Sequence, residues 1–588
     1  MNSIQKNTQR LFQDALNRCS EEGLIKGTTP EVPITLPKKP EHGDFATSVA
    51  LMTAKKAGRP PRELAQMIID RIQDPDGIID SIEIAGPGFI NIRLSDDVWY
   101  RGLETILRES SDFGRGVKRA QPKINIEFVS ANPTGPLHVG HGRGAAVGDA
   151  LAKLLRFAGF QVGSEYYLND AGRQIRNLGQ SVYVRALEIL REENSPVLKE
   201  SSIDIPEFPE DGYRGDYVND IAQDLLEEKG AEWVVENTDI ENISSFAAAQ
   251  LTTTIRKSLE NFNVHFDVWF SEKKLHESGS IKNSVNELRK TSYIYEKDGA
   301  LWFKSSELGD EKDRVVVRDS GEPTYFASDI AYHADKYERG FDHLINVWGA
   351  DHHGYVARMK GAVQALGHSP DSLETLLVQF VTLKRGDEKV SMGKRSGQFV
   401  TVDDLLEEVG RDPMRYFFLE RRHDSHIDFD IETARSQDPT VNPAVYVQYG
   451  HARACSIIRK AEKELGINKQ AFSIELARQL KHEDELRILR RMMDFPVIVE
   501  DAAEAREPHR VINYLQDLSR QFQSYYTRTK SDPVLPPPSV RKGDWQENWD
   551  WKKTHARLMW VEAIAIICKS CLDILGLAAP TRMARLSE

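Results

Sequence analysis

Residues 123–144 read K-I-N-I-E-F-V-S-A-N-P-T-G-P-L-H-V-G-H-G-R-G, and they decide the expected fold. Apolar and polar residues alternate over 123–128, which predicts a β-strand, and the prolines that follow end it. From Val147 on, apolar residues recur at helical spacing, and a second strand is expected at 162–168. The order strand, loop, helix, strand predicts an α/β domain built on a parallel sheet with a helix on one face.

The loop before this helix is rich in glycine and histidine. His138, Gly140, His141 and Gly142 stand at the expected start of the helix. Free backbone N–H groups and the helix dipole favour an anion there, and glycine lets a ligand approach the backbone closely. The spacing therefore predicts a phosphate site, although a bare H-x-G-H also fits a glycine-rich turn with two structural histidines.

The string S-A-N-P-T-G-P-L-H-V-G-H-G-R over 130–143 resembles the nucleotide-binding signature of class I aminoacyl-tRNA synthetases, and within that class the arginyl-tRNA synthetases. Y-L-N-D-A-G-R-Q over 167–174 is similar to the same family. The resemblance implies a Rossmann-like catalytic domain that activates L-arginine with ATP and Mg²⁺ to arginyl-adenylate, with tRNA present. It also implies transfer of the arginyl group to tRNA(Arg), with release of AMP and pyrophosphate.

Length and composition are ordinary for a globular protein. The 588 residues suffice for several domains, and hydrophobic residues make up 40% of the chain. No run of about 18 apolar residues occurs, and the polar N-terminus lacks the apolar core of a signal peptide. We therefore expect a cytoplasmic protein without a membrane segment, and a monomer. Cys568 and Cys571 are expected to be buried on a helix, so neither a zinc site nor a disulfide framework is expected.

The charge is acidic but unevenly distributed. The chain has 77 Lys and Arg against 90 Asp and Glu, a net charge of −13, which favours an acidic metabolic enzyme over a nucleic-acid binder. Residues 441–588 hold 23 Lys and Arg against 19 Asp and Glu. This C-terminal excess permits a local basic face.

The resemblance covers most of the chain and divides it into segments. These are an N-terminal α+β tRNA-elbow-binding domain (1–95), a connector (96–121), the catalytic domain (122–385) with an insertion at about 190–262, a signature loop with a connecting region (386–440), and an α-helical anticodon-binding domain (441–588). Within the catalytic domain, the apolar run 376–383 predicts a single strand.

A basic loop, K-R-G-D-E-K-V-S-M-G-K-R-S-G, spans 384–397. It resembles the second class I signature, K-M-S-K-S. The resemblance implies that Met392 contacts ATP and that Lys394 holds the departing pyrophosphate, so that Lys394 acts in catalysis together with the two histidines. A solvated basic hairpin is the alternative explanation of this loop.

The loop also departs from its signature. Ser391 and Gly393 replace a lysine and a serine, and Lys389 is the candidate to supply the missing charge. Many family members lack the lysine at 394 and carry one at the position of Gly135 instead.

A carboxylate-rich set of side chains stands near the ends of the expected strands. By resemblance these residues match the arginine pocket of the family: Glu127, Asn132, Tyr325, Asp329 and Asp351. A guanidinium group needs hydrogen-bond acceptors in a fork arrangement, which such side chains provide.

Two members of this set have alternative explanations. Asp329 also fits the N-cap of a helix. Asp351 stands where other members carry Gln, and together with His352 and His353 it also fits a metal site.

Candidates for tRNA contact lie outside the catalytic domain. The G-P-G-F-I-N element resembles the family's N-terminal domain, which implies that Phe89 stacks on a base and that Asn91 hydrogen-bonds to tRNA. Phe89 also fits a core position. Tyr446 and Tyr449 lie in a string that resembles the start of the anticodon-binding domain, and the aromatics of 521–528 fit either base stacking or helix packing.

Two other functional classes remain open from the sequence. A nucleotidyltransferase of the same superfamily shares the H-x-G-H loop but needs neither 1–95 nor 441–588. A catalytically inactive tRNA-binding relative needs neither the two histidines nor Lys394. The presence of all these features favours the synthetase.

Overall fold

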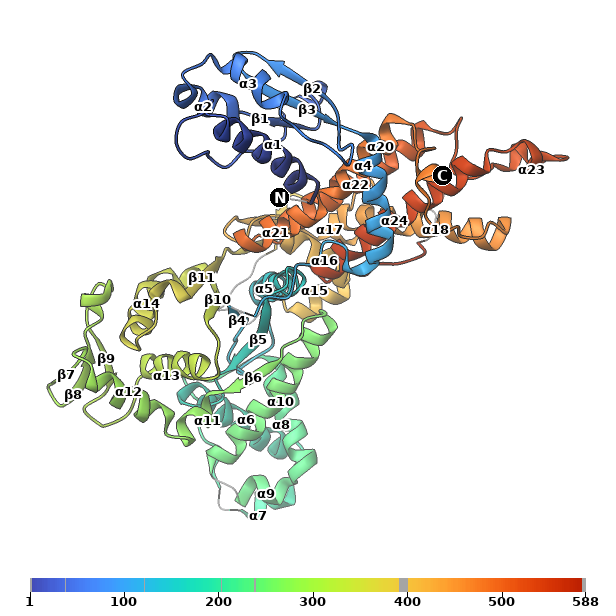
Figure 1. Ribbon diagram of the computed structural model, residues 1–588. Helices are drawn as coiled ribbons and strands as arrows, with labels where there is room; N and C mark the ends of the chain where they lie inside the picture. Colours follow the sequence, from blue (N-terminus) through green and yellow to red (C-terminus); the bar gives the residue numbers. More distant parts are fainter. Residues whose placement is uncertain are drawn as a thin grey trace.

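The computed structural model describes residues 3–37, 39–120, 122–201, 203–236, 239–390 and 400–583. Figure 1 shows an N-terminal α/β unit, a central parallel sheet with helical modules around it, and a C-terminal helical bundle between the two. Within the described residues, no helix combines the length and the apolar character needed to span a membrane.

The central sheet has five strands in the order β11-β10-β4-β5-β6, and all neighbours are parallel. The strands are β4 (Lys123–Phe128), β5 (Gln161–Leu168), β6 (Val268–Ser271), β10 (His343–Gly349) and β11 (Leu373–Val378). Helix α5 (Val139–Phe157) connects β4 to β5, so the predicted parallel α/β sheet is confirmed. The strand order reverses between β4 and β10, and ligands of such sheets bind at the carboxyl ends of the strands beside that point.

Strand β4 lies at the centre of the sheet and is buried on both faces. Only Lys123 is exposed, and the polar Asn125 and Glu127 are buried with the apolar residues. Asn125 Nδ2 donates to Glu165 Oε2 on β5 at 3.1 Å, and Glu127 pairs with Lys336. The alternating pattern of β4 therefore marks a strand, but its polar face requires partners inside the protein.

The apolar run 376–383 forms two strands, so the prediction of a single strand is wrong. Its first part ends β11, and its second part begins β12 (Val381–Arg385), which pairs in parallel with β14 (Ile427–Asp430) in another sheet. Gln379 stands between them, and its carbonyl accepts from the buried Arg143 at 2.8 Å. Apolar residues flank Gln379 on both sides, so the sequence reads as one strand and gives no sign of this bend.

Two helical modules flank the sheet. The module between β5 and β6 has its own apolar core and consists of α6 (Arg173–Glu192), α7 (Pro196–Glu200), α8 (Asp216–Lys229), α9 (Ala231–Glu236) and α10 (Ile240–Asn261). The module between β6 and β10 consists of α11 (Glu272–Glu277), α12 (Ser280–Lys290), the antiparallel β7 (Ile294–Lys297), β8 (Ala300–Phe303) and β9 (Arg314–Val317), and α13 (Tyr325–Glu338).

The remaining catalytic elements follow β10 along the chain. They are the 3-10 helix η4 (Ala350–Tyr355), α14 (Val356–Ala365), β13 (Glu388–Lys389), α15 (Val402–Val409), α16 (Arg411–Leu419) and α17 (Ile431–Arg435).

The N-terminal unit packs helices on a small antiparallel sheet. Its elements are α1 (Ser3–Glu21), β1 (Phe45–Thr47), α2 (Val49–Ala57), α3 (Pro61–Ile69), β2 (Ile79–Ala85) and β3 (Phe89–Leu94), with strand order β1-β3-β2. Gly88 in the turn between β2 and β3 has φ of 144°, and a Cβ there would lie 2.8 Å from Pro61. Glycine is therefore required at this position.

The C-terminal bundle incorporates the connector helix. Helix α4 (Asp96–Glu109) packs on α20 (Glu483–Met493) and α24 (Trp551–Leu575), as Figure 1 shows, and Tyr100 Oη donates to Leu480 O at 2.9 Å. The main helices of the bundle are α18 (Pro443–Leu465), α20 (Glu483–Met493), α21 (Phe495–Ala505), α22 (His509–Arg528) and α24 (Trp551–Leu575). Cys568 and Cys571 are fully buried in α24, as expected.

A buried arginine joins the bundle to the catalytic domain. Arg415 of α16 donates to Asp149 Oδ2 of α5 at 2.5 Å, to Leu575 O of α24 at 3.0 Å and to Phe262 O at 3.1 Å. Since all its partners are inside the protein, the position of α5 depends on the C-terminal bundle as well as on the sheet.

Candidate active site

The chain turns sharply where β4 ends. Val129 and Ser130 have φ of 68° and 43°, which places two non-glycine residues in the left-handed region. This conformation is unfavourable for a β-branched residue and persists only where neighbours fix it. The Ser130 hydroxyl donates to Glu127 Oε1 at 3.0 Å and accepts from the backbone N–H of Tyr167 at 3.1 Å. The strained turn starts the loop that leads to His138.

The helical insertion holds the middle of this loop. Tyr217 of α8 donates from its hydroxyl to Thr134 O at 2.7 Å. A Cβ on Gly135 would lie 3.2 Å from the same hydroxyl. A lysine at 135 would therefore require Tyr217 to move.

The two histidines stack at the N-terminus of α5. Their ring centroids are 3.6 Å apart, and the backbone N–H of His138 donates to His141 Nδ1 at 3.3 Å. Gly140 is exposed, and a Cβ there would lie 2.9 Å from His138 Cε1. Two imidazole rings and the exposed backbone of Gly140 thus lie at the N-terminus of α5, where the helix dipole is positive. This arrangement suits the binding of an anion.

The segment after the signature loop is hydrogen-bonded to the histidine segment. Val139 N donates to Val400 O at 3.2 Å, and Val402 N donates to Leu137 O at 2.8 Å. Met392 and Lys394 fall within 391–399, outside the described residues. Val400, the first described residue after them, lies beside the start of α5.

Gly142 faces the protein interior. A Cβ at this position would lie 3.0 Å from Met414, 3.2 Å from Phe418 and 3.3 Å from Val402. Its small size is thus required by helix packing, and its contact with ATP stays a prediction.

Asp329 lies in the second turn of α13, with its carboxylate hydrogen-bonded to the Tyr355 hydroxyl. Thr324 is the N-cap of α13, so the alternative that Asp329 caps the helix is wrong. Burial raises the pKa of Asp329 to about 7, and the nearby carboxylates of Glu127 and Glu272 add to the rise. Three acidic groups thus converge at the carboxyl edge of the sheet.

Glu127 has an internal partner. It is 7% exposed, and its Oε2 accepts from Lys336 Nζ at 2.6 Å. The pocket therefore contains one buried ammonium group among its carboxylates.

Glu272, the first residue of α11, was not identified from the sequence. It is 3% exposed, burial raises its pKa, and its carboxylate lies beside Tyr167 and Ser328. The only sequence signal is an acidic residue directly after a strand, which also fits an ordinary helix start.

The other three candidates for the arginine pocket are more exposed, and their place in it stays a prediction. Asn132 Nδ2 donates to Gln174 Oε1 at 2.6 Å, and Tyr325 is 55% exposed. Asp351 is exposed and lies 3.8 Å from His352 Nε2. No group of three or more potential metal ligands occurs in the part of the chain that the structure describes.

The candidates for tRNA contact differ in exposure. Phe89 is 45% exposed, so the alternative that it belongs to the core is wrong, whereas Asn91 is 8% exposed in the middle of β3. Tyr446 is half-buried against the bundle core. Tyr449 lines a groove instead.

This groove has a volume of about 900 Å³ and lies between α18, α22 and the prolines at 533–538. The guanidinium group of Arg453 is 4.7 Å from the ring centroid of Tyr449 and 4.8 Å from that of Tyr526. Aromatic rings with a cation between them form a stacking platform for nucleic-acid bases.

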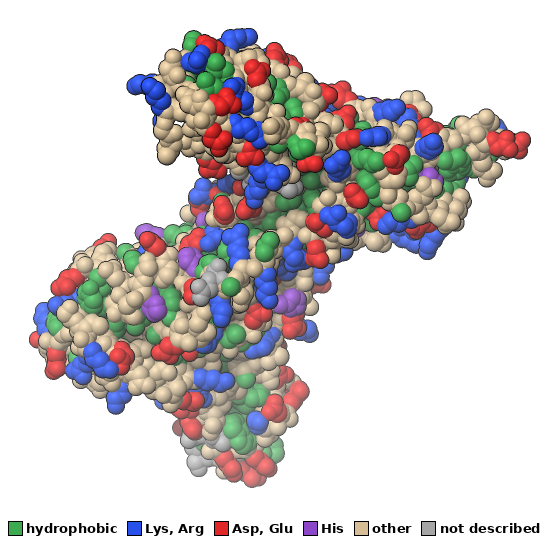
Figure 2. Space-filling view, viewed as in Figure 1, with side chains coloured by type: hydrophobic (Ala, Val, Ile, Leu, Met, Phe, Trp, Pro, Cys, Tyr) green, Lys and Arg blue, Asp and Glu red, His purple; other side chains and the backbone are tan. Residues whose placement is uncertain are grey.

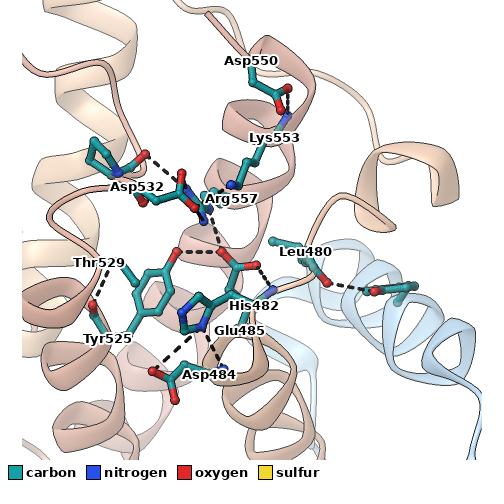
Figure 3. A network of polar contacts seen from close by, with 12 residues as sticks. Leu480, His482, Asp484, Glu485, Tyr525, Thr529, Asp532, Asp550, Lys553 and Arg557 are labelled. Atoms are coloured by element: carbon teal, nitrogen blue, oxygen red, sulfur yellow. Dashed lines mark hydrogen bonds and ion pairs between the residues drawn. The ribbon is translucent and has the colours of Figure 1, made fainter. Parts of the chain in front are cut away.

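Figure 3 shows the buried network that holds the proline segment of the groove. Arg557 of α24 donates to Glu485 Oε1 at 2.6 Å and to Asp532 Oδ2 at 2.7 Å. It also donates to Asp532 O at 2.9 Å, and this guanidinium group holds the pKa of Asp532 down at about 2. Tyr525, beside the groove residue Tyr526, donates to the same Glu485 oxygen at 2.7 Å.

We expect Arg557→Met to lower the free energy of unfolding by about 3 kcal/mol, because it leaves the buried Glu485 without its cation. Urea unfolding measures the effect. Lys553→Met is the control, since Lys553 contacts the same Asp532 from a partly exposed position and should change stability by less than about 1 kcal/mol. Equal losses of stability in the two variants would contradict the role of Arg557 as the main cation of this buried network.

Comparison with known proteins gives matches along most of the chain. The family model described as tRNA synthetases class I (R), catalytic domain, matches residues 103–441. The DALR anticodon binding domain matches 447–583, and the arginyl tRNA synthetase N terminal domain matches 6–94.

Relatives that match this chain along nearly its whole length share the same name. A protein of Desulforamulus reducens named arginine–tRNA ligase is 43% identical over 99% of both chains. One of Citrifermentans bemidjiense with the same name is 44% identical over 96% of this chain and 97% of its own. The solved Thermus thermophilus arginyl-tRNA synthetase, at 22% identity, shares the fold, with a TM-score of 0.71 over 98% of this chain and 100% of its own.

Proposed function

The chain belongs to the arginyl-tRNA synthetase family, and we propose that it activates L-arginine with ATP to arginyl-adenylate and transfers the arginyl group to tRNA(Arg). The observation that carries this proposal is a buried acidic pocket at the same sheet edge as the paired histidines of α5. AMP and pyrophosphate are the other products.

We assign the acidic pocket to the arginine side chain. A guanidinium group presents five N–H donors in a planar fork, and carboxylates are its best partners. Asp329, Glu127 and Glu272 supply acceptors at the pocket floor, with Asn132, Tyr325 and Asp351 at its rim. A neutral amino acid would leave these acceptors unpaired at about 1–3 kcal/mol each, so arginine is selected against most competitors.

We assign the N-terminus of α5 to ATP. His138 and His141 contact the phosphates and the ribose side, and Gly140 allows the nucleotide to approach the backbone. The activation step forms a bond between the arginine carboxylate and the α-phosphorus and breaks the bond to pyrophosphate. Positioning and charge stabilisation carry the rate of such a step.

The roles of the signature loop and of Mg²⁺ stay predictions. Lys394 is expected to hold the departing pyrophosphate and Met392 to contact ATP, with Lys389 as the candidate for the missing signature lysine. Mg²⁺ bound with ATP would neutralise charge on the phosphate oxygens.

We propose that tRNA is held by the N-terminal and C-terminal domains that flank the catalytic domain. The proposed boundaries between the segments of the chain lie near residues 95, 121, 385 and 440. Figure 2 shows a hollow between the N-terminal unit and the catalytic body, bordered by basic and acidic side chains together. Because the net charge of the chain is −13, we expect tRNA to be bound through separate local contacts and not by one uniform basic face. Phe89 and the groove at Tyr449 are the best-placed contacts, with Asn91 and Tyr446 as further candidates. A cytoplasmic monomer is the expected state.

One assay separates the functional classes. ATP–pyrophosphate exchange is measured with each amino acid, with and without tRNA(Arg). Exchange with arginine alone among the amino acids, and only with tRNA, is the expected result. Exchange with another small molecule and no need for tRNA would indicate a nucleotidyltransferase, and tRNA binding without any exchange an inactive relative.

Arginine binding should weaken as the pH falls below about 7. The pKa of Asp329 is raised to about 7 in the pocket without substrate, so a proton competes with the guanidinium group for the carboxylate. Binding of arginine favours the ionised form and releases that proton, and the arginine Kd should rise by up to about tenfold per pH unit below 7. Calorimetry in two buffers of different ionisation enthalpy measures the proton release. Binding without proton release at pH 7 would contradict the role of Asp329.

A further inference from the structure

A lysine lies fully buried beneath the acidic pocket. Lys336 of α13 is 0% exposed, and its Nζ lies 2.6 Å from Glu127 Oε2 and 4.2 Å from the centroid of the Tyr332 ring. Lysine is almost never fully buried without a partner, because removing an ammonium group from water is unfavourable. Lys336 belongs to none of the signature motifs, and its sequence surroundings, D-K-Y-E-R, resemble an ordinary exposed helix surface.

A chain of hydrogen bonds links Lys336 to the backbone of Asp329. Lys336 Nζ lies 3.4 Å from Asn346 Oδ1, and Asn346 Nδ2 lies 2.9 Å from His333 Nε2. His333 Nδ1 lies 2.7 Å from Asp329 O.

The proton positions along this chain follow from Lys336. An ammonium group only donates, so the amide oxygen of Asn346 faces it and the amide NH₂ faces His333. His333 Nε2 therefore accepts, and its Nδ1–H donates to the carbonyl of Asp329. Burial lowers the pKa of His333 to about 3, which agrees with a neutral ring.

The chain connects both walls of the pocket. Asp329, His333 and Lys336 are spaced by four and three residues, so they lie on one face of α13. That face meets β4 through Glu127 and β10 through Asn346. One helix face thus fixes the side chain of Glu127 and the backbone that carries Asp329.

We propose that Lys336 is a positioning residue for arginine recognition, which holds Glu127 in place as an acceptor for the substrate. This inference rests on the proposed function. Without Lys336, the buried Glu127 carboxylate would lose the contact that fixes its Oε2 and its counterion in the interior. A buried carboxylate without a partner is unfavourable, so the side chain would leave its acceptor orientation and arginine binding would weaken.

The charged and titratable groups around Glu127 come from several elements. They are Lys336, Asp329 and Tyr332 of α13 and Tyr167 of β5, with Glu272 of α11 beside Asp329. Among the described residues, Lys336 is the cation in direct contact with the Glu127 carboxylate, so its removal should have the largest effect on the orientation of that carboxylate.

The test compares Lys336→Met with Arg339→Met. Methionine keeps the length and removes the charge. Arg339 is the C-cap of the same helix and pairs at 2.7 Å with Glu165 of β5, a carboxylate that is 1% exposed. Among the described residues it contacts neither Glu127 nor the hydrogen-bond chain. Both substitutions therefore remove the cation of an ion pair with a buried carboxylate.

Wild-type exchange with arginine is measured first, and its absence would refute the proposed function itself. For Lys336→Met we expect the arginine KM to rise about tenfold or more, with the ATP KM changed less than about threefold. Arg339→Met should lower the Tm without changing the arginine KM.

A double variant covers the case in which Lys336→Met does not fold. Lys336→Met/Glu127→Gln removes both charges of this buried pair, so it should fold, with a raised arginine KM and an ATP KM changed less than about threefold. An arginine KM of Lys336→Met equal to that of the wild type would overturn the proposal. So would a parallel rise of the arginine and ATP KM values in either variant.

Discussion

Asp329→Asn is expected to lower kcat/KM for arginine by about a thousandfold while the ATP KM changes less than about threefold. Asparagine keeps the shape of the side chain but removes the negative charge and one acceptor. Charge-assisted hydrogen bonds in a buried site are the strongest contacts available to a guanidinium group. Since Glu127 is already paired with Lys336, Asp329 carries the larger share of the uncompensated charge.

The measurement is arginine-dependent ATP–pyrophosphate exchange in the presence of tRNA(Arg). Asp335→Asn is the control, because Asp335 lies on the same helix and pairs with Arg339 away from the pocket. It should leave the arginine KM unchanged. An unchanged arginine KM in Asp329→Asn would refute the pocket assignment, and a fall in ATP affinity alone would move Asp329 to the nucleotide site.

The elements that position the site were predictable because they have strong local signals. The alternation in β4, the prolines after it and the periodicity of α5 each follow from the sequence. The histidines were placed correctly at the helix start, since H-x-G-H marks the point where strand periodicity changes to helical periodicity. The burial of Gly142 was not predictable, because its neighbours Met414 and Phe418 come from α16, far along the chain.

The residues missed by sequence reasoning depend on tertiary contacts. Glu272 becomes a pocket residue because β6 pairs with β5 and brings the start of α11 to the sheet edge. Lys336 reads as a surface lysine, and only the packing of α13 against β4 buries it. The bend at Gln379 needs Arg143 from another helix. Local patterns reveal strands, turns and helix starts, whereas the partners of buried polar groups emerge from the assembled fold.

Replacing both histidines, His138→Asn and His141→Asn together, is expected to lower kcat for adenylate formation by about 10²–10³ with little change in the arginine KM. Negative charge develops on the phosphate oxygens as the α-phosphorus is attacked, and donors fixed at the start of α5 stabilise that charge more than the ground state. Asparagine can still accept and donate at the helix start, so α5 should form.

The stacking of the two rings at 3.6 Å makes their effects non-additive, so each single variant should lose most of what the double variant loses. His352→Asn is the matched control: His352 is exposed near the end of β10 at the same sheet edge, and its removal should leave kcat unchanged. Single-turnover formation of arginyl-adenylate separates the chemical step from product release. A wild-type kcat in the double variant would contradict the contact of the two histidines with the ATP phosphates. An equal loss of kcat in His352→Asn would indicate a general disturbance of this edge of the sheet. A fall in kcat confined to the α5 pair would mean that the helix terminus acts on the transition state, because a site that only bound ATP would show its loss in KM.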